Sequence, residues 1–409
     1  MRRAWRTIPE LKPMFAHRGL RVTLTDEAGF AQLSQVILLG VAHRRLALAL
    51  RVGAPRPRVE KLLQHTKKLR AFRRRDALGE VLLPNGGSSS DRNEMARALT
   101  AHWAATFVET PTSAEGRNAF CLRHVDPIPN LRVPLPSPKA VGHAVRRGSS
   151  SAPGPDGIAG AIWRQFASLV TIEFYGIARD VWEGGSIPPD SNAALAAYIP
   201  KKCLTRGDHG LQARPAEARP LMLKNSDTKV MCRVLAYSLM PILQDWCHPS
   251  QRGFIKNRMP GLGILEIDTA ARCIAVCHRL GLIGLFDFSA AFPSISRLFI
   301  LAVMRAALFP PWMVTMAAAT WSGSRVVNND GVTEYCMNDG VGQGCPSAAA
   351  LFVIGINPLL VALDKLCALH ECEVVSAYAD NIAICITSAD RLQCVYAISR
   401  SSSKPPRLT

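Results

Sequence analysis

The sequence predicts an α+β protein with a basic, mainly helical extension at its N-terminus. Of the 409 residues, 48% are hydrophobic and 20% are charged, which is typical of a globular chain and excludes wholesale disorder. From about residue 146 onward, short apolar runs of strand length alternate with longer helical patterns. Before residue 80, apolar residues recur at helical spacing among many basic ones. These observations predict a mixed domain behind a helical arm.

Positive charge is concentrated in that arm. The chain carries 49 Lys and Arg against 31 Asp and Glu, a formal net charge of +18. Residues 1–80 hold 18 of the basic residues and 6 of the acidic ones. Blocks of one sign repel themselves and commonly meet phosphate, although a solvated helix face is the alternative. The densest block therefore predicts contact with nucleic acid through Lys67, Lys68, Arg70, Arg73, Arg74 and Arg75.

Composition divides the chain into four segments. Residues 1–80 are the basic extension, and residues 81–145 form a linker region with a helix capped by Asp91 and a Pro-rich extended stretch. Residues 146–398 form the main α+β domain, and the Ser- and Pro-rich residues 399–409 are expected to be a disordered tail.

The composition also argues against a membrane span and a disulfide scaffold. The longest uncharged stretch, Val341 to Leu363, contains glycines, prolines and amides, which suit a buried polar site better than lipid. We therefore expect no membrane partner. The 12 cysteines form no C-x-x-C pairs, which predicts free thiols in an intracellular, reducing compartment and no zinc site. The sequence leaves cytoplasm and nucleus both open.

Two acidic residues follow apolar runs of strand length. Asp287 comes directly after the run from Leu282 to Phe286, and we expect a helix to begin just after Pro293. Asp380 and Asn381 lie between two further apolar runs, a pattern typical of a hairpin. Taken alone, Asp287 is also explained by a helix cap, and the second pair by an ordinary β-turn.

A glycine-rich loop, Gly340 to Ser347, lies between these two elements in the chain and precedes an apolar helix. Such a loop lets backbone approach a ligand, and a helix N-terminus favours anions. Two carboxylates from a strand end and a hairpin can hold two Mg²⁺ ions about 4 Å apart, the arrangement that clamps a phosphoryl transfer. The order of the three elements is more specific than any one of them.

In this order the elements resemble those of reverse transcriptases, most closely of non-LTR (LINE-type) retrotransposons. The resemblance covers roughly Ser150 to Arg391. It rests on Ala152-Pro-Gly-Pro-Asp-Gly-Ile158, Ile199-Pro-Lys-Lys202, Arg219-Pro-Leu221 with Asn225-Ser-Asp-Thr-Lys229, Gln251-Arg-Gly-Phe254, Phe286-Asp287 with Ala291-Phe292, Gln343-Gly-Cys-Pro346 and Ala377-Tyr-Ala-Asp380.

The resemblance implies a right-hand polymerase, with fingers and palm, that performs RNA-directed DNA synthesis. It implies two Mg²⁺ ions, an RNA template, a DNA primer and deoxynucleoside triphosphates. Asp287 and Asp380 would be the catalytic metal ligands, joined by the main-chain carbonyl of Phe288 and by Asn381. The nucleotide-binding residues that it implies are Arg219, Lys201 (or Lys202), Phe292, Gln343 and Gly344. Phe292 would exclude a ribose 2′-OH by its bulk, with ordinary core packing as the alternative.

The sequence also departs from the family pattern. Asn381 places a neutral amide where the family has a second aspartate, Pro293 replaces an aspartate, and Gly342 replaces an arginine. The chain ends 29 residues after Asp380, so we expect an incomplete fingers-palm unit without a thumb. Two interpretations follow. The chain is a fragment of a retrotransposon reverse transcriptase, or it is a catalytically inactive relic that at most binds nucleic acid.

Overall fold

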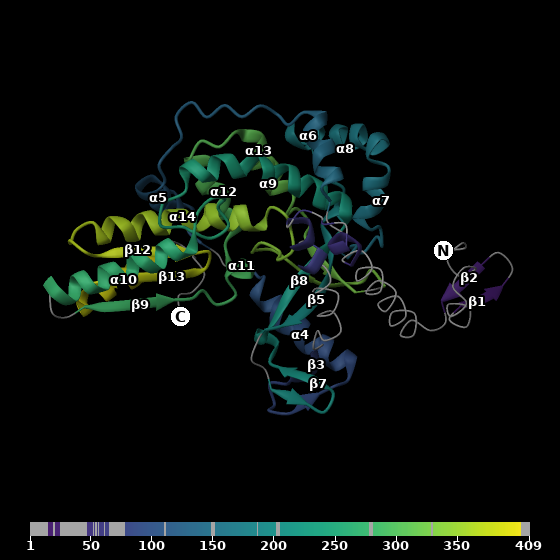
Figure 1. Cartoon of the computed structure of the whole chain (residues 1–409), viewed down its shortest axis with the longest axis horizontal. Coiled ribbons are helices and arrows are strands. Elements are labelled where there is room, and N and C mark those ends of the chain that lie inside the picture. The colour runs from purple at the N-terminus through teal and green to yellow at the C-terminus, as the bar shows by residue number, and fades with distance from the viewer. Residues whose placement is uncertain are drawn as a thin grey trace. The chain divides into compact units, whose positions relative to one another are not determined.

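The chain forms two compact units, Met1–Ala77 and Leu78–Thr409, in the computed structural model (Figure 1). The structure describes residues 15–18, 21–24, 47–51, 53, 55, 57–60, 62–64, 78–109, 112–148, 152–185, 187–201, 205–277, 281–328 and 330–401.

The N-terminal unit contains a strand pair as well as helix. Strands β1 (Phe15–Arg18) and β2 (Arg21–Leu24) are antiparallel, and residues 47–51, 57–60 and 62–64 are helical. The described residues of this unit therefore include a strand pair beside helix, and the mainly helical extension stays a prediction. The second strand of the pair carries Val22 and Thr23, whose β-branched side chains favour extended backbone. The predicted nucleic-acid-binding residues of the arm, 67–75, lie outside the described residues.

Strands in the described part of Leu78–Thr409 form three sheets, with orders β4-β3-β7-β6, β11-β10-β5-β8 and β12-β13-β9. The second and third are called here the β8 sheet and the β9 sheet. The strands are β3 (Leu78–Leu82), β4 (Ser88–Ser89), β5 (Ala193–Pro200), β6 (Arg206–Gly207), β7 (Gly210–Ala213), β8 (Ala218–Lys224), β9 (Leu282–Phe286), β10 (Arg325–Val327), β11 (Thr333–Cys336), β12 (Val374–Tyr378) and β13 (Asn381–Ile386).

Helices surround these sheets (Figure 1). They are α4 (Arg92–Thr106), α5 (Ala114–His124), α6 (Pro138–Arg146), α7 (Gly160–Gln165), α8 (Ala167–Trp182), α9 (Ser226–Trp246), α10 (Pro260–Cys277), α11 (Ala291–Ser294), α12 (Arg297–Ala306), α13 (Pro311–Ala319), α14 (Ala348–Cys367) and α15 (Ala389–Ser401). Helix α4 begins as predicted, because the Asp91 side chain accepts hydrogen bonds from the main-chain N–H groups of Asn93 and Glu94.

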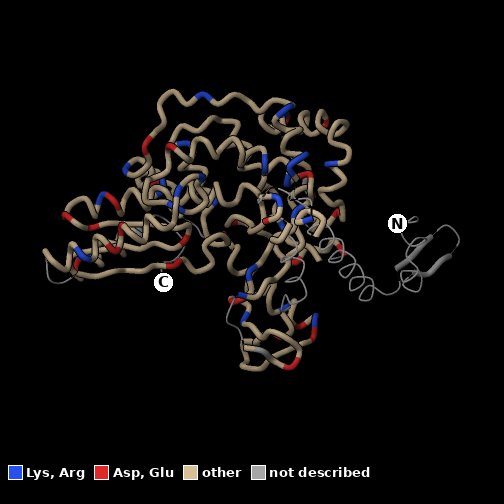
Figure 2. The backbone as a smooth tube through the Cα atoms, viewed as in Figure 1, with Lys and Arg blue, Asp and Glu red and all other residues tan. Residues whose placement is uncertain are grey.

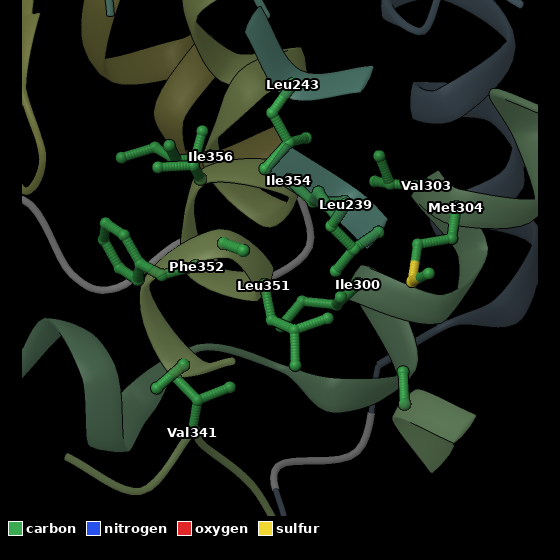
Figure 3. Close-up of a cluster of buried hydrophobic side chains, with 14 of the residues drawn as sticks. Leu239, Leu243, Ile300, Val303, Met304, Val341, Leu351, Phe352, Ile354 and Ile356 are labelled. Atoms are coloured by element: carbon green, nitrogen blue, oxygen red, sulfur yellow. The ribbon is translucent and has the colours of Figure 1, made fainter. Parts of the chain in front are cut away.

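Helix α14 lies in the largest hydrophobic core. Figure 3 shows its Leu351, Phe352 and Ile354 among side chains of α9 and α12. Among the described residues, α14 is long and apolar enough to span a membrane, but 83% of its apolar 18-residue stretch is buried inside the protein. Burial of this helix supports the expectation that the uncharged stretch is protein interior, where each apolar side chain contributes about 1.5–3 kcal/mol.

Three features of this unit differ from the composition-based expectations. Helix α6 crosses residue 145 and packs against α8 and α9, so the structure has no break at that predicted boundary. Helix α15 continues to Ser401, into the segment expected to be a disordered tail. Cys273 of α10 forms a disulfide with Cys372, which corrects the expectation of free thiols at these two positions. The pairing escaped sequence reasoning because the two cysteines are 99 positions apart.

Candidate active site

Strand pairing brings two carboxylates to one end of the β9 sheet. Strand β9 ends as predicted at Phe286, which lies opposite Ile382 of the antiparallel strand β13. Asp287 therefore leaves the sheet at the same end as the β12–β13 turn, which consists of Ala379 and Asp380. Two acidic residues that are 93 positions apart in the sequence thus meet at one sheet end.

The pKa of Asp380 reflects its proximity to Asp287. Partial burial raises the pKa of its carboxyl group, and the negative charge of Asp287 raises it further. A hydrogen bond from its own main-chain N–H and the positive charge of Arg219 act in the opposite direction but do not cancel the rise. The surroundings of Asp380 therefore disfavour its ionised form. A cation between the two carboxylates would reduce this electrostatic cost.

Asn381 is exposed and begins strand β13, opposite Tyr378. The hairpin is present as predicted, but its two-residue turn lies one position earlier than the expected Asp380-Asn381. The side-chain Nδ2 of Asn381 donates a long hydrogen bond of 3.5 Å to Oδ1 of Asp380. In this orientation the amide turns its donor, not its oxygen, toward the carboxylate. The side chains at this sheet end that could hold a metal are therefore two carboxylates, one of which accepts a hydrogen bond from the Asn381 amide.

A pocket of about 430 Å³ opens beside these residues, between α10 and the β9 sheet. Asp287, Tyr378 and Asn381 line its sheet side, and apolar residues of α10 line the other. Arg252 also lines the pocket, and its guanidinium forms an ion pair with Glu266 of α10. The pocket gives Asp287 an accessible side, as a carboxylate that meets a substrate requires.

Phe292 is held between two other aromatic rings. Its ring stacks on Phe352 of α14, with centroids 4.6 Å apart and planes 12° apart. Phe254 contacts it edge-on at 5.9 Å. These contacts are the core packing considered as the alternative for Phe292, and its role against a ribose 2′-OH stays a prediction.

The loop that carries Phe292 contains a one-turn helix before the expected one. Pro293 lies inside the single-turn helix α11, and the longer helix α12 begins at Arg297 after its cap, Ser296. A proline is tolerated in a first turn because its missing N–H has no partner there in any case. The expected helix is α12, and a one-turn helix that contains Pro293 precedes it.

The glycine-rich loop packs against this helix turn. Gly340 has φ +76°, and a Cβ there would lie 2.1 Å from the main-chain oxygen of Pro293. The loop N–H groups of Gly340 and Val341 donate to the main-chain oxygens of Ile295 and Phe292 at 3.0 and 2.8 Å. At Gly340, close approach to the backbone of Pro293 requires a glycine, and the expected approach of the loop to a ligand stays a prediction.

The other end of the loop pairs with strand β8. The main-chain N–H of Met222 donates to the oxygen of Gln343 at 2.8 Å, and Gln343 forms a parallel bridge with Leu221. Gly344 has φ +95°, and a Cβ there would lie 2.8 Å from the Leu221 side chain. The loop thus connects the β8 sheet to the turn that carries Phe292.

Strand β8 supplies a positive charge to the site. Arg219 is exposed opposite Ile199 of β5, and its charge lowers the pKa of Asp380 against the prevailing rise. Lys201 follows the last residue of β5. The pKa of His102 is lowered mainly by burial of its own ring and also by the charge of Lys201. The structure thus relates Arg219 to the carboxylates and Lys201 to α4. Lys202 is outside the described residues.

A family profile described as "Reverse transcriptase (RNA-dependent DNA polymerase)" matches residues 199–405. The chain belongs to this family. It is 25% identical over 272 residues to the "Transposon TX1 uncharacterized 149 kDa protein" of Xenopus laevis, a match that covers 62% of the chain. It is 28% identical over 225 residues to the "Retrovirus-related Pol polyprotein from type-2 retrotransposable element R2DM" of Drosophila melanogaster, covering 54% of the chain.

These findings confirm the resemblance to non-LTR retrotransposon reverse transcriptases. The match to either relative spans 20% of that protein's length. The reverse transcriptase match includes Arg219, Phe292, Gln343, Asp287 and Asp380, so every residue placed around the site above falls inside it. Mixed helix and sheet, as observed, is compatible with a polymerase fingers-palm fold. Polymerases of this family generally use divalent metal ions.

Sequence reasoning missed a buried arginine and a buried aspartate, Arg297 and Asp339, behind the glycine-rich loop. The main-chain N–H of Arg297 donates to Oδ1 of Asp339 at 2.6 Å, and its guanidinium donates to the oxygens of Gly340 and Met337. Burial lowers the pKa of Arg297 to about 10 and raises that of Asp339. The pair fixes the start of the glycine-rich loop against α12. No local pattern indicates it, since the partners are 42 positions apart.

The first motif of the resemblance is a structural turn. A Cβ on Gly154 would lie 2.4 Å from the main-chain nitrogen of Asn225, and Asn225 Oδ1 accepts from the N–H of Asp156 at 3.2 Å. Lys229 donates to the oxygen of Ala152 at 2.9 Å. Two separate reverse transcriptase motifs therefore hold each other at the start of α9, away from the carboxylates.

Proposed function

We propose that this chain carries an RNA-directed DNA polymerase site whose catalytic carboxylates are Asp287 and Asp380. The observation that supports this most is the β9–β13 pairing, which delivers both carboxylates to one sheet end where their charges act on each other. In this proposal the β9 sheet belongs to the palm and the β8 sheet to the fingers. The substrates are an RNA template, a DNA primer and deoxynucleoside triphosphates.

Two Mg²⁺ ions fit the donor set only in part. Asp287, Asp380 and the main-chain carbonyl of Phe288 would hold them, since Mg²⁺ prefers a few carboxylates together with water and substrate phosphates. Bound there, the ions stabilise the attacking and leaving oxygens of an in-line displacement. Asn381 supplies no negative charge and directs its Nδ2 at Asp380, so it weakens the site.

Neighbouring residues position the nucleotide in this proposal. Arg219 contacts the triphosphate, where a guanidinium can make two parallel hydrogen bonds to phosphate oxygens. Gln343 and Gly344 lie against the base pair being formed, because the bridge to β8 fixes their backbone. The clamped ring of Phe292 stands against the sugar and excludes a 2′-OH by bulk.

The template and primer are expected to involve the basic extension. Beyond residue 80, acidic and basic side chains are interspersed along the described chain (Figure 2), whereas residues 1–80 carry 18 basic and 6 acidic residues. Contacts with phosphate release counterions, so affinity for RNA or DNA should fall steeply as salt is raised. Removing residues 1–77, the N-terminal unit, should flatten the salt dependence. An unchanged slope would show that the extension is only a solvated surface.

Primer extension on an RNA template tests the function. We expect weak Mg²⁺-dependent synthesis that Asp287→Ala abolishes and Asn381→Asp increases. A single stabilising group of this kind is worth about 10²–10³ in rate. A gain in Asn381→Asp that disappears in the double variant with Asp287→Ala would assign the synthesis to this site. Nucleic-acid binding without synthesis in either Asn381 form would instead support the inactive relic.

A further inference from the structure

The segment Gln251–Phe254 runs beside strand β12 and extends the β9 sheet. The main-chain N–H of Ala377 donates to the oxygen of Ser250 at 2.9 Å, and the N–H of Arg252 donates to the oxygen of Ala377 at 2.7 Å. Gln251 thus lies opposite Ala377 in a short parallel bridge. The segment therefore lies close to the hairpin turn that follows the last residue of β12.

The Gln251 side chain forms hydrogen bonds with this turn. It is 0% exposed, and its amide bonds both main-chain groups of Ala379. Its Oε1 accepts from the N–H of Ala379 at 2.9 Å and from the N–H of Gly253 at 2.8 Å. Its Nε2 donates to the oxygen of Ala379 at 3.3 Å. One side chain therefore continues, by two residues, the pairing that the backbone begins at Ala377.

Ala379 is the residue that most needs such support. It has φ +57°, a left-handed conformation that is unfavourable for a residue with a Cβ, and it directly precedes Asp380. Gly253 encloses it from the same side, because a Cβ on Gly253 would lie 2.3 Å from the nitrogen of Ala379. The backbone conformation of Ala379 sets where the Asp380 carboxylate points, since the two residues form the turn.

We infer that Gln251 is a positioning residue that holds the hairpin turn in its left-handed conformation and so aims Asp380 at the metal site. It does not touch substrate or metal in this arrangement, and it acts through the backbone of Ala379. The catalytic part of the inference rests on the function proposed above. The mechanical part, that one buried amide holds the turn, stands on the hydrogen bonds alone.

The test compares two buried amides in the full-length chain. Gln251→Met keeps the length and approximate volume of the side chain but removes every hydrogen bond to Ala379. Asn357→Leu is the control, because Asn357 is also buried and its Oδ1 accepts from the N–H of His248 at 2.7 Å, in the same stretch of chain but away from the hairpin. Gln251→Glu, which keeps acceptor oxygens at the same place, is the conservative variant.

The first readout is amide hydrogen exchange of the hairpin, residues 377–381, with no metal added. We expect faster exchange there in Gln251→Met, partial protection in Gln251→Glu, and protection as in the unmodified chain in Asn357→Leu. Equal exchange in the Met variant and the unmodified chain would overturn the inference. So would equal acceleration in Gln251→Met and Asn357→Leu, because that result would mean only general loosening.

The second readout is Mn²⁺ affinity, measured by the electron spin resonance of the free ion. We expect Gln251→Met to weaken binding by roughly 10–100-fold, as loss of a supporting hydrogen bond behind a metal ligand does. Asn357→Leu should leave the affinity unchanged. The proposed polymerase function fails if the unmodified chain shows no Mn²⁺ binding that is lost in Asp287→Ala. In that case hydrogen exchange still decides the role of Gln251.

Discussion

The carboxylate end of the β9 sheet and the glycine-rich loop are built in opposite ways. At the sheet end, Asp287 and Asn381 are exposed, and the pKa of Asp380 is raised by burial and by a neighbouring negative charge. The loop has glycines of positive φ in close contact with neighbouring residues, and behind it the main-chain N–H of Arg297 donates to the buried carboxylate of Asp339. The first region is electrostatically unfavourable as it stands, and the second is closely satisfied.

The two regions therefore differ in what stabilises them: a bound cation would stabilise the proposed carboxylate site, whereas contacts within the protein stabilise the loop. In the proposed site a bound cation would offset the repulsion between the two carboxylates, and it would arrive with the substrate. A loop that must keep Gln343 beside β8 needs contacts that are complete without any ligand. Substitutions in the first region should therefore change activity with little loss of stability, and substitutions in the second should do the reverse.

The largest effect should come from Arg297→Met. This change removes the guanidinium that donates to the oxygens of Gly340 and Met337, while the main-chain N–H that binds Asp339 stays in place. Each buried oxygen that loses its donor costs about 1–3 kcal/mol of unfolding free energy. Chemical denaturation at pH 7 measures the loss. Arg272→Met is the control, because its exposed ion pair with Asp268 is worth only about 0–1 kcal/mol.

Asp380→Asn should show the converse behaviour. Removal of a catalytic carboxylate is expected to lower the extension rate by about 10²–10³ or more. The raised pKa of Asp380 means that the fold disfavours its ionised form, a penalty that is present above the raised pKa and absent below the unfolded one. Neutral Asn removes it, so the melting temperature at pH 7 should stay level or rise. A clear fall, larger than that of the exposed Asp208→Asn, would contradict the comparison.

Gly340→Ala probes the steric part of the loop. The new Cβ would lie 2.1 Å from the oxygen of Pro293 at a φ of +76°, so the loop must move. We expect a loss of about 1–3 kcal/mol. Gly176→Ala is matched in chemistry but not in space, since nothing lies within 4 Å of its Cβ inside α8. That variant should be stabilised by about 0.5–1 kcal/mol. Thermal unfolding of both variants checks the contrast.

The smallest effect should be a shift in pH dependence. Asp380 must be ionised to bind a cation, so metal affinity should fall on acidification at a higher pH than for an ordinary aspartate. The charge of Arg219 lowers the pKa of Asp380, so Arg219→Gln should move this acid limb further upward. Mn²⁺ titrations across pH would measure it. Arg214→Gln removes an exposed charge just before β8, and an identical shift there would make the effect non-specific.

Local patterns in the sequence determined the elements that carry the chemistry. The apolar run from Leu282 to Phe286 is strand β9, the hairpin is present between Val374 and Ile386, and Asp91 caps α4. The ordered motifs also identified the reverse transcriptase family, which the comparisons confirm. Such features depend on residues within a few positions of one another, where strand periodicity, turn chemistry and capping operate.

Only the tertiary structure decided how those elements are held. The turn lies at Ala379-Asp380 rather than one residue later, and Gln251, 128 positions away, bonds the turn residue Ala379. The hydrogen bond between Arg297 and Asp339 behind the glycine-rich loop, the close approach that makes Gly340 necessary and the disulfide of Cys273 likewise join distant segments. Contacts of this kind leave no local periodicity, because their energy depends on where the fold places the second partner.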